Sequence, residues 1–299
     1  MSWIKNKNVI ITGVSTGIGK ELAKLFVNKY HCKVLGVARS VGKLEALKAE
    51  LGENFSFYPM DISSRENWEA FAAGAATEFK PDILINNAGM IHPFANICDL
   101  SDRDVERTVN TNYLSHIYAA RTMIPVLEKS AYPGYVNIAS ASALLPVAGQ
   151  SIYSSTKAAV YAMSECIRQE YEGEGWYVGY VLPGPVKTDL YSAKASDGAE
   201  AKAKVKDGLI TKIGQTAPHA AKVICRCMAR RQSRIVLGAV AHLMGFGHQL
   251  FPRTVPSMAS KLMSVVPLQS FKDIFKNTKA NKAARKAQRK ALKAEKKAK

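Results

Sequence analysis

The sequence predicts a doubly wound α/β fold: a parallel sheet of about seven strands in a single domain, with a helical, basic carboxyl-terminal extension. Short apolar runs alternate with amphipathic stretches along most of the chain, which is the pattern of βαβ units. The first apolar run leads directly into a glycine-rich turn. Because 299 residues with 47% hydrophobic content can bury a full core, one large domain is expected rather than two equal ones.

Seven runs rich in apolar and β-branched residues are the expected strands. In chain order they are Val9–Thr12, Lys33–Ala38, Phe55–Met60, Ile83–Asn86, Tyr135–Ala139, Val178–Leu182 and Arg234–Leu237. Stretches in which apolar residues recur every three or four positions are the expected helices. They are Lys20–Tyr30, a stretch through Leu44 and Leu51, Trp68–Phe79, Asp102–Lys129 and Tyr153–Tyr171. Each helix connects two strands, as a parallel sheet requires.

The glycine turn Thr12–Gly19 has the spacing G-x-x-x-G-x-G. Gly13 allows a tight turn out of the first strand, Gly17 lets the backbone approach a pyrophosphate, and Gly19 permits close packing of the following helix. The N–H groups of that helix would face the anion. A purely structural turn is the alternative, but its place between a strand and an amphipathic helix favours a nucleotide site.

The residue after the second strand indicates which dinucleotide binds. The sequence there reads Ala38-Arg39-Ser40, where an NAD site often carries an acidic residue for the ribose hydroxyl. Arg39 would instead meet a 2′-phosphate, so NADP is preferred over NAD. The alternative is that Arg39 is an ordinary solvated surface residue.

Tyr153 and Lys157 stand four residues apart, thirteen residues after Ser140. On a helix these two positions share one face, so the ammonium of Lys157 can lie beside the Tyr153 phenol and lower its pKa. A phenol with an ordinary pKa of about 10 is a poor base at neutral pH, and a nearby cation moves it into a useful range. The pair alone is a weak indicator, but its context makes it specific.

Together these residues resemble the short-chain dehydrogenase/reductase family over about residues 5 to 190. The matching positions are Thr12–Gly19, Asp61, Asn86–Gly89, Asn112, Ser140, Tyr153, Lys157 and Pro183–Thr188. The resemblance implies a Rossmann-type fold, a catalytic set of Asn112, Ser140, Tyr153 and Lys157, and a homodimer. It also implies a cofactor-binding set, namely Gly13, Ser15, Thr16, Gly17, Ile18, Gly19, Arg39, Asp61, Ile62, Asn87, Ala88, Gly89, Tyr153, Lys157, Pro183, Gly184, Val186 and Thr188.

The resemblance also implies a role for each catalytic residue. In the reductive direction Tyr153 would give a proton to the carbonyl oxygen while the cofactor delivers hydride to the carbon. Ser140 would hydrogen-bond that oxygen, Lys157 would grip the nicotinamide ribose, and Asn112 would position a water that links Lys157 to solvent. Taken singly, Ser140 could be a strand-end cap, Asn112 an interior polar group and Lys157 a surface charge. At these joint spacings the catalytic interpretation is favoured.

Specificity is expected to lie in two places in the chain, the loop before Tyr153 and the last third. Position between Ser140 and Tyr153 makes Ser142, Val147 and Gln150 candidates for the substrate pocket. In this family the segment after the sixth strand usually covers the substrate, so 190–212 is the candidate lid. Its Ala, Lys and Asp content suggests mobility.

The sequence divides into a catalytic domain at 1–238, an apolar and basic helical extension at 239–275, and a Lys/Ala-rich tail at 276–299. The uncharged stretch Ile235–Pro252 is at the lower limit for a membrane span, but its glycines and histidines argue against one. With Val255–Phe271 it could form amphipathic cover for an oily pocket, helices on a membrane surface, or ordinary core or dimer packing. Arginines 230, 231, 234 and 253 flank these segments.

The positive charge is concentrated in the last third of the chain. The net charge is −1 for residues 1–189, +9 for 190–275 and +10 for 276–299, within a total of +18. A tail of this kind would attract anionic lipid headgroups or nucleic acid. Lipid is preferred because apolar segments precede the tail, nucleic acid is not expected, and a disordered solubilising tail is the alternative.

The cysteines and histidines give no sign of a metal. The five cysteines are odd in number and lack a C-x-x-C spacing, which fits free thiols in a reducing compartment. His242 and His248 are six residues apart and would not share a helical face, so no metal is expected. The first apolar run starts at Val9 and leaves no room for a cleaved signal peptide, so a cytoplasmic protein is expected, with peripheral membrane contact as an option.

The function expected from the sequence is therefore an NADP-dependent oxidoreductase that interconverts a carbonyl and a primary or secondary alcohol. The apolar carboxyl-terminal segments favour an apolar, lipid-like substrate. Two alternatives stay open: a reductase of small polar carbonyls whose tail does not touch a membrane, and a protein that senses the nucleotide without turning it over.

Overall fold

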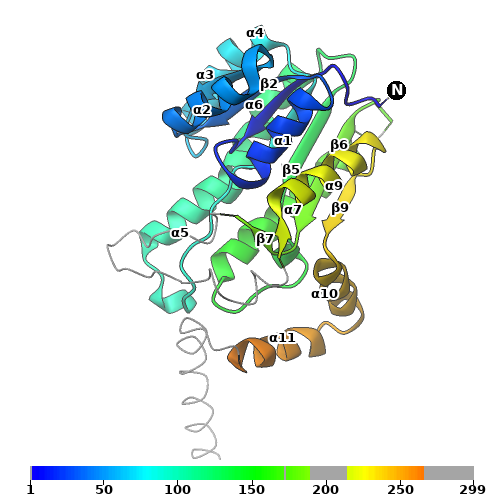
Figure 1. The fold of residues 1–299 in the computed structure, drawn as a ribbon. Coiled ribbons are helices and arrows are strands. Elements are labelled where there is room, and N and C mark those ends of the chain that lie inside the picture. The colour runs from blue at the N-terminus through cyan, green and yellow to red at the C-terminus, as the bar shows by residue number, and fades with distance from the viewer. Residues whose placement is uncertain (1, 172, 189–213, 266–299) are drawn as a thin grey trace, which may run out of the picture.

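The computed structural model describes residues 2–171, 173–188 and 214–265. Its centre is a sheet of seven parallel strands in the order β3-β2-β1-β4-β5-β6-β9 (Figure 1). Every expected strand is present, with its ends shifted by at most one residue: β1 Asn8–Thr12, β2 Lys33–Ala38, β3 Phe55–Pro59, β4 Ile83–Asn86, β5 Gly134–Ile138, β6 Tyr177–Pro183 and β9 Arg234–Leu237. The strand order reverses between β1 and β4, so the doubly wound Rossmann-type α/β fold is confirmed.

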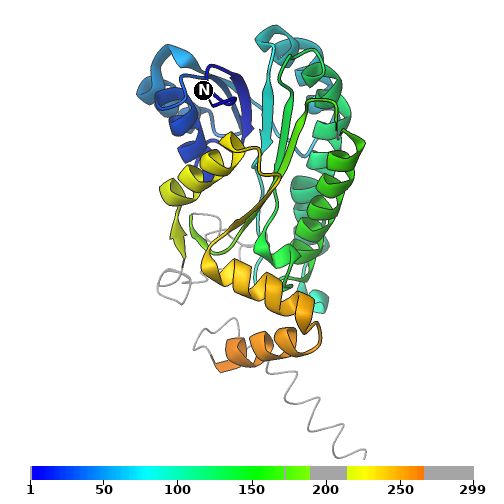
Figure 2. The ribbon, with the colours of Figure 1, turned by 90° about the vertical axis from the view of Figure 1, so that its right-hand side faces the viewer.

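Helices cover both faces of the sheet, as Figure 2 shows. Helices α1 (Gly17–Asn28), α2 (Val41–Leu51) and α9 (Ala217–Ala229) share one buried core with the sheet. Helices α3 (Arg65–Phe71), α6 (Ser115–Leu127) and α7 (Ser151–Glu170) share the core on the other face. Successive side chains of β1 point to opposite faces of the sheet. Val9 and Ile11 therefore pack in the first core and Ile10 packs in the second.

Two of the expected helices contain a wider π-type turn. The expected helix Asp102–Lys129 is divided into α5 (Asp102–Val109), the π turn η4 (Asn110–Leu114) and α6. The expected helix Trp68–Phe79 is divided into α3, the π turn η2 (Ala72–Ala76) and the short α4 (Thr77–Phe79). An extra residue in one turn does not disturb the apolar spacing on either side of it, so the sequence pattern runs on as one helix.

Short elements complete the connections. Single turns of 3₁₀ helix occur at η1 (Gly52–Asn54), η3 (Ile97–Asp99) and η5 (Ala141–Ala143). A two-residue ladder, which the sequence pattern did not predict, joins β7 (Val186–Lys187) to β8 (Gln215–Thr216). The candidate lid at 190–212 and the tail at 276–299 lie outside the described residues.

After β9 the chain turns at Gly238, which has a φ of +92°, and forms α10 (Ala239–Leu250) and α11 (Thr254–Val265). The expected seventh strand is therefore present, and α10 and α11 lie within the part of the expected extension, 239–265, that the structure describes. Among the described residues, no helix has the length and apolarity needed to cross a bilayer. Arg231 does not lie beside these helices. Its guanidinium donates to the carbonyl oxygens of Gly175 and Trp176, which precede β6, so it lies at the amino ends of the strands, whereas α10 follows the carboxyl end of β9.

Candidate active site

The backbone of the glycine turn leaves little room for a side chain at its glycine positions. Gly13 and Gly17 have φ values of +73° and +59°, which favour glycine. A methyl group on Gly13 would lie 2.8 Å from Cα of Ala88, and one on Gly19 would lie 2.4 Å from the Gly13 carbonyl oxygen. The turn can therefore bring backbone close to a ligand, as a pyrophosphate requires.

The amino terminus of α1 is left free for an anion. Thr16 is the N-cap residue, but its side chain does not cap the helix, and the first turn carries no acidic residue. By contrast, the caps of α3 and α5, Ser64 and Ser101, each accept a backbone hydrogen bond. The uncapped N–H groups of α1 and the helix dipole make this end fit a phosphate.

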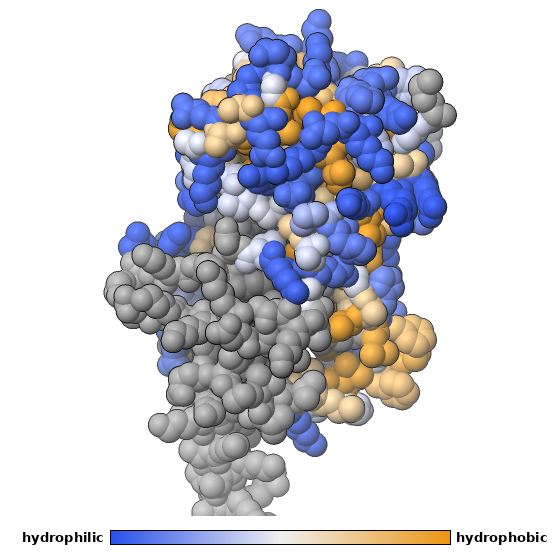
Figure 3. Space-filling view, viewed as in Figure 1, coloured by the Kyte–Doolittle hydropathy of each residue, from blue (hydrophilic) through white to orange (hydrophobic). Residues whose placement is uncertain are grey.

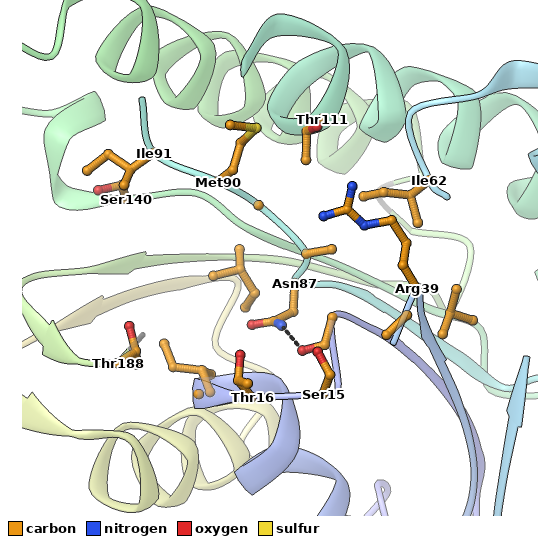
Figure 4. A pocket seen from close by; sticks show the side chains of 18 of the residues that line it. Ser15, Thr16, Arg39, Ile62, Asn87, Met90, Ile91, Thr111, Ser140 and Thr188 are labelled. Atoms are coloured by element: carbon orange, nitrogen blue, oxygen red, sulfur yellow. Dashed lines mark hydrogen bonds between the residues drawn. The ribbon is translucent and has the colours of Figure 1, made fainter. Parts of the chain in front are cut away.

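Asn87, at the end of β4, fixes the turn from the other side. Its amide nitrogen donates to the carbonyl oxygens of Thr12 (2.9 Å) and Gly13 (3.3 Å), and it reaches back to the turn in Figure 4. The Thr12 hydroxyl accepts from the backbone N–H groups of Asn87 and Ala88, each at 3.0 Å. The sequence analysis assigned Thr12 no role beyond its place in the motif, and here it joins the ends of β1 and β4.

A cleft of about 710 Å³ runs along the carboxyl ends of the strands. Its walls include every expected cofactor residue except Gly19, whose place is in the packing between the turn and α1. They also include Ser140. Residues of the wall that the sequence analysis did not select are Val37, Ala38, Ser40, Lys43, Met60, Met90, Ile91, Arg103, Arg107, Thr111, Ile138 and Ala139.

Basic side chains gather at the end of the cleft beside β2 and β3. Arg39 lies 4.0 Å from Asp61 between Nη1 and Oδ2, and its side chain is 70% exposed (Figure 4). Burial by itself would raise the pKa of Asp61, but hydrogen bonds from Ser63 and the charges of Arg39 and Arg107 outweigh it and lower the pKa. Lys43 and Arg107 also line the cleft, and the charge of Arg107 reaches Asp61.

The opposite end of the cleft holds three of the four candidate catalytic residues. Ser140 follows β5, and its hydroxyl accepts from the N–H of Ser142 at 3.1 Å. Tyr153 and Lys157 lie in the first and second turns of α7 and are 9% and 4% exposed. Ser140, Tyr153 and Lys157 therefore meet at one place, although they come from two elements.

The electrostatics of this end differ from the sequence expectation in one respect. Burial raises the pKa of Tyr153, while a hydrogen bond with the Ser140 hydroxyl lowers it by less. Burial also lowers the pKa of Lys157 to about 8, and its Nζ donates to the Ile138 carbonyl at 2.9 Å. The expected lowering of the Tyr153 pKa by Lys157 is absent from this arrangement, because the ammonium is turned toward the backbone of β5. A raised pKa keeps the phenol protonated at neutral pH.

Asn112, the fourth candidate, lies behind the cleft wall on the π turn η4. Its side chain donates to the carbonyl of Met90 and accepts from the N–H of Met90, both at 2.8 Å. A methyl group on Gly89 would lie 3.2 Å from both Asn112 Oδ1 and Lys157 Nζ, so the bare backbone of Gly89 separates the two side chains. Asn112 thus fixes the loop after β4 against α7.

The three candidate substrate residues do not line the cleft. Ser142 and Gln150 are buried, and their Oγ and Oε1 atoms have no hydrogen-bond partner among the residues that the structure describes. The Gln150 amide donates to the His92 carbonyl at 3.0 Å, and the N–H of Val147 donates to Ser154 Oγ at 3.5 Å. The substrate assignment of Ser142, Val147 and Gln150 stays a prediction.

The two histidines that were set aside as metal ligands bond backbone instead. His242 Nδ1 lies 3.0 Å from the Gly238 carbonyl oxygen, and His248 Nδ1 lies 2.5 Å from that of Leu144. Within the described residues, no group of three or more His, Cys, Asp or Glu side chains is placed to hold a metal.

A family model described as short chain dehydrogenase matches residues 7–199. The chain belongs to the short-chain dehydrogenase family. Its curated relatives include an NADP-dependent 3-hydroxy acid dehydrogenase of Salmonella typhimurium, with 32% identity over 196 residues, covering 65% of this chain and 79% of the relative. They also include the human very-long-chain 3-oxoacyl-CoA reductase, with 32% identity over 188 residues and 60% of either chain covered.

Solved structures agree with this family assignment. A serine dehydrogenase complexed with NADP⁺ has a TM-score of 0.68 to this chain at 25% identity, and the match covers 77% of this chain and 94% of the enzyme. A short-chain dehydrogenase of Streptomyces avermitilis has a TM-score of 0.72 at 25% identity, covering 86% and 98%.

Proposed function

We propose that this short-chain dehydrogenase is an NADP-dependent oxidoreductase that interconverts a carbonyl and an alcohol, with Tyr153 as general acid and base. One observation carries the proposal: a single cleft extends from an uncapped helix terminus and a bare glycine turn to Ser140, Tyr153 and Lys157. A nucleotide-sensing protein would need the first half of this cleft but not the second. The buried Tyr153–Lys157 face therefore favours turnover.

The cofactor proposal rests on the charge beside β2. Arg39 and Lys43 line the cleft beside β2, where the 2′-phosphate of NADP would extend, and no acidic residue stands at the end of β2 to bind a ribose hydroxyl. Asn87, Ala88 and Gly89 would border the adenosine ribose, and Pro183, Gly184, Val186 and Thr188 would flank the nicotinamide. The NADP-dependent dehydrogenase of Salmonella and the NADP⁺ complex of serine dehydrogenase support the same choice. When bound in reduced form, the dinucleotide supplies the hydride.

The protein's own residues supply the proton and the orientation. A Tyr153 phenol with a raised pKa is protonated at neutral pH and can donate to a carbonyl oxygen. Ser140, hydrogen-bonded to that phenol, would hold the same oxygen in reach. Lys157 would turn from the Ile138 carbonyl toward the ribose hydroxyls, and Asn112 would keep the wall behind it in place.

The proposed substrate is apolar and lipid-like. The relative in human acts, by its name, on very-long-chain 3-oxoacyl-CoA, and the helix α10 beside the substrate end carries exposed apolar side chains. A specific observation also favours a second candidate, a small hydroxy acid: the bacterial relatives include 3-hydroxy acid and serine 3-dehydrogenases.

We further propose a homodimer in the cytoplasm with peripheral membrane contact, and no role for nucleic acid.

An assay of NADPH oxidation on matched carbonyl substrates tests this function. The panel contains medium-chain and long-chain 3-oxoacyl thioesters, long-chain ketones and small 3-oxo acids, each with NADPH and with NADH. We expect turnover with NADPH that increases with chain length. Equal rates for all chain lengths would favour the small-substrate candidate. Binding of NADPH without oxidation on any substrate would contradict the enzyme proposal.

A further inference from the structure

Helix α10 is oriented with its apolar side outward. The face that packs on the catalytic domain carries Ala241 and Gly245, which are buried, and His248, which bonds the Leu144 carbonyl. The face roughly 180° away at helical spacing carries Leu243, Phe246 and Leu250, which are 73%, 63% and 56% exposed. An ordinary surface helix buries its large apolar side chains, whereas α10 exposes these three together with the polar His242 and Gln249.

The exposed apolar surface continues into the next segment. Phe251 and Met258 are 60% and 62% exposed, and α11 packs beside α10. Among the described residues, these five side chains are the majority of the eight large hydrophobic ones that are exposed. Figure 3 shows the hydrophobic colour gathered over this corner of the molecule. We call Leu243, Phe246, Leu250, Phe251 and Met258 the apolar corner.

The apolar corner lies next to the substrate end of the cleft. A methyl group on Gly245 would approach Leu144, four residues after Ser140, to 2.8 Å. A methyl group on Gly184, in the cleft wall, would lie 3.3 Å from Cβ of Ala241. The small residues of α10 therefore seat it directly against both loops that border the proposed substrate position.

The charge near the apolar corner favours an anionic partner. Arg253 and Lys261 are the charged residues of 239–265, this stretch contains no Asp or Glu, and the sequence from 276 onward carries a net charge of +10. In a two-fold pairing of two copies through this surface, the Arg253 side chains would add positive charge on both sides, and 239–265 supplies no Asp or Glu to offset it. A bilayer with anionic headgroups satisfies both features, since it accepts apolar side chains below a negatively charged surface.

We propose that the apolar corner docks on an anionic membrane surface and directs the substrate end of the cleft toward the bilayer. The docking itself needs only α10 and α11; the delivery of substrate from the bilayer rests on the proposed function. Leu243, Phe246 and Leu250 insert among the acyl chains while Arg253 and Lys261 meet the headgroups. An apolar substrate then enters beside Leu144 without crossing water.

Flotation of the full-length protein with vesicles tests the docking. The vesicles are phosphatidylcholine with and without phosphatidylserine, and the variants are Phe246→Ser with Leu250→Ser, and Tyr132→Ser. Tyr132 is a matched control because it is 52% exposed and precedes β5, so it lies at the amino ends of the strands, away from α10. We expect the wild type and Y132S to float with the anionic vesicles, and F246S/L250S to bind roughly tenfold less or weaker still. Thermal unfolding shows whether all three proteins are equally folded.

Two outcomes would overturn the proposal. If F246S/L250S floats as well as the wild type, the tail alone holds the membrane. If the wild type does not float but is a dimer that F246S/L250S converts to a monomer, the apolar corner is a contact between copies. NADPH oxidation with a soluble carbonyl is measured on the same samples. Failure of the proposed function appears as no oxidation by any of them, whereas failure of the docking leaves oxidation intact.

Discussion

Helices α7 and α10 both border the substrate end of the cleft, and they distribute polar and apolar groups in opposite ways. Helix α7 buries Tyr153 and Lys157 against the sheet, where desolvation shifts both pKa values toward the neutral forms. Helix α10 exposes Leu243 and Phe246 to the outside. Each arrangement costs stability in an isolated domain, and we propose a ligand for each: a carbonyl substrate for α7 and a lipid surface for α10.

The comparison also teaches how each helix is held in its arrangement. Buried polar groups on α7 are satisfied by backbone, as when Lys157 donates to the Ile138 carbonyl and Thr156 donates to that of Tyr153. The outward position of the apolar face of α10 depends on small residues on its inner face. A methyl group on Gly245 would lie only 2.8 Å from Leu144 Cδ1, so glycine allows the close approach. Breaking the first arrangement should therefore affect chemistry, and breaking the second should affect location.

The largest effect is expected from Tyr153→Phe. Removing the phenolic hydroxyl takes away the proposed proton donor while leaving the ring in its buried site, so kcat should fall by roughly 10²- to 10⁴-fold. The measurement is steady-state NADPH oxidation, with nucleotide binding followed by fluorescence. Tyr161→Phe makes the same chemical change on the same helix, two turns further along, and should keep nearly full activity. Equal loss in both variants would point to a structural role for α7 tyrosines.

A smaller effect is expected from Arg39→Ala. Loss of a charge-assisted contact with the 2′-phosphate should weaken NADPH binding roughly tenfold or more and leave NADH binding nearly unchanged. Adding Lys43→Ala should widen the difference. Lys48→Ala removes a cation from the same helix near Glu53, outside the cleft wall, and serves as the control. Parallel weakening of both nucleotides by Arg39→Ala would show that Arg39 does not read the phosphate.

A third prediction concerns the dependence of stability on pH. The pKa of Lys157 is lowered from 10.5 to about 8 in the folded protein, so between these values the unfolded chain holds a proton that the folded chain has released. The free energy of unfolding of the wild type should therefore rise with pH across this window relative to Lys157→Met. The difference should reach at most about 3 kcal/mol. Urea unfolding of both proteins without added nucleotide measures it, and a difference that is constant with pH would contradict the burial of the ammonium.

The smallest effect is expected from Asn112→Ala on the loop after β4. The variant loses both hydrogen bonds to Met90, so the free energy of unfolding should fall by about 1 to 3 kcal/mol. Activity should fall as well, since Gly89 is held between Asn112 and Lys157. Asn67→Ala, which removes a side-chain hydrogen bond to the Asp61 carbonyl from an exposed position, is the comparison and should cost less. Equal stability losses in the two variants would show that Asn112 does not anchor the loop.

The strands and the shared helical face of Tyr153 and Lys157 were predictable because their signals are local. Buried parallel strands are continuous apolar runs that end at polar or glycine residues, so the strand bounds were predicted to within one residue. The spacing of Tyr153 and Lys157 defines one helical face wherever the helix lies. The family resemblance drawn from these motifs is confirmed by the match over residues 7–199.

The remaining features depend on contacts between distant parts of the chain. The π turn at Asn112 is accompanied by hydrogen bonds to Met90, and nothing in the helical spacing indicates it. Lys43 and Arg107 reach the cleft from separate helices, so only the fold brings them together. Arg231 is close to α10 in the sequence but not in space. It precedes β9 and lies at the amino ends of the strands, whereas α10 follows the carboxyl end of β9.

Which face of α10 points outward could not be predicted from the sequence, for a related reason. The segment is apolar on most sides, so either face could have been the buried one. The close approach of Gly245 to Leu144 and the bond from His248 decide it. Only then does the outward position of Phe246 carry information about a partner.

Isotope transfer tests the central claim most directly. The protein is incubated with NADPH carrying deuterium at both C4 positions and a long-chain 3-oxoacyl thioester, and the product is examined by mass spectrometry. We predict an alcohol with one deuterium on the former carbonyl carbon from the wild type, and a yield reduced by orders of magnitude from Tyr153→Phe. Bound NADPH with no labelled alcohol from any carbonyl in the panel would contradict hydride transfer at this site.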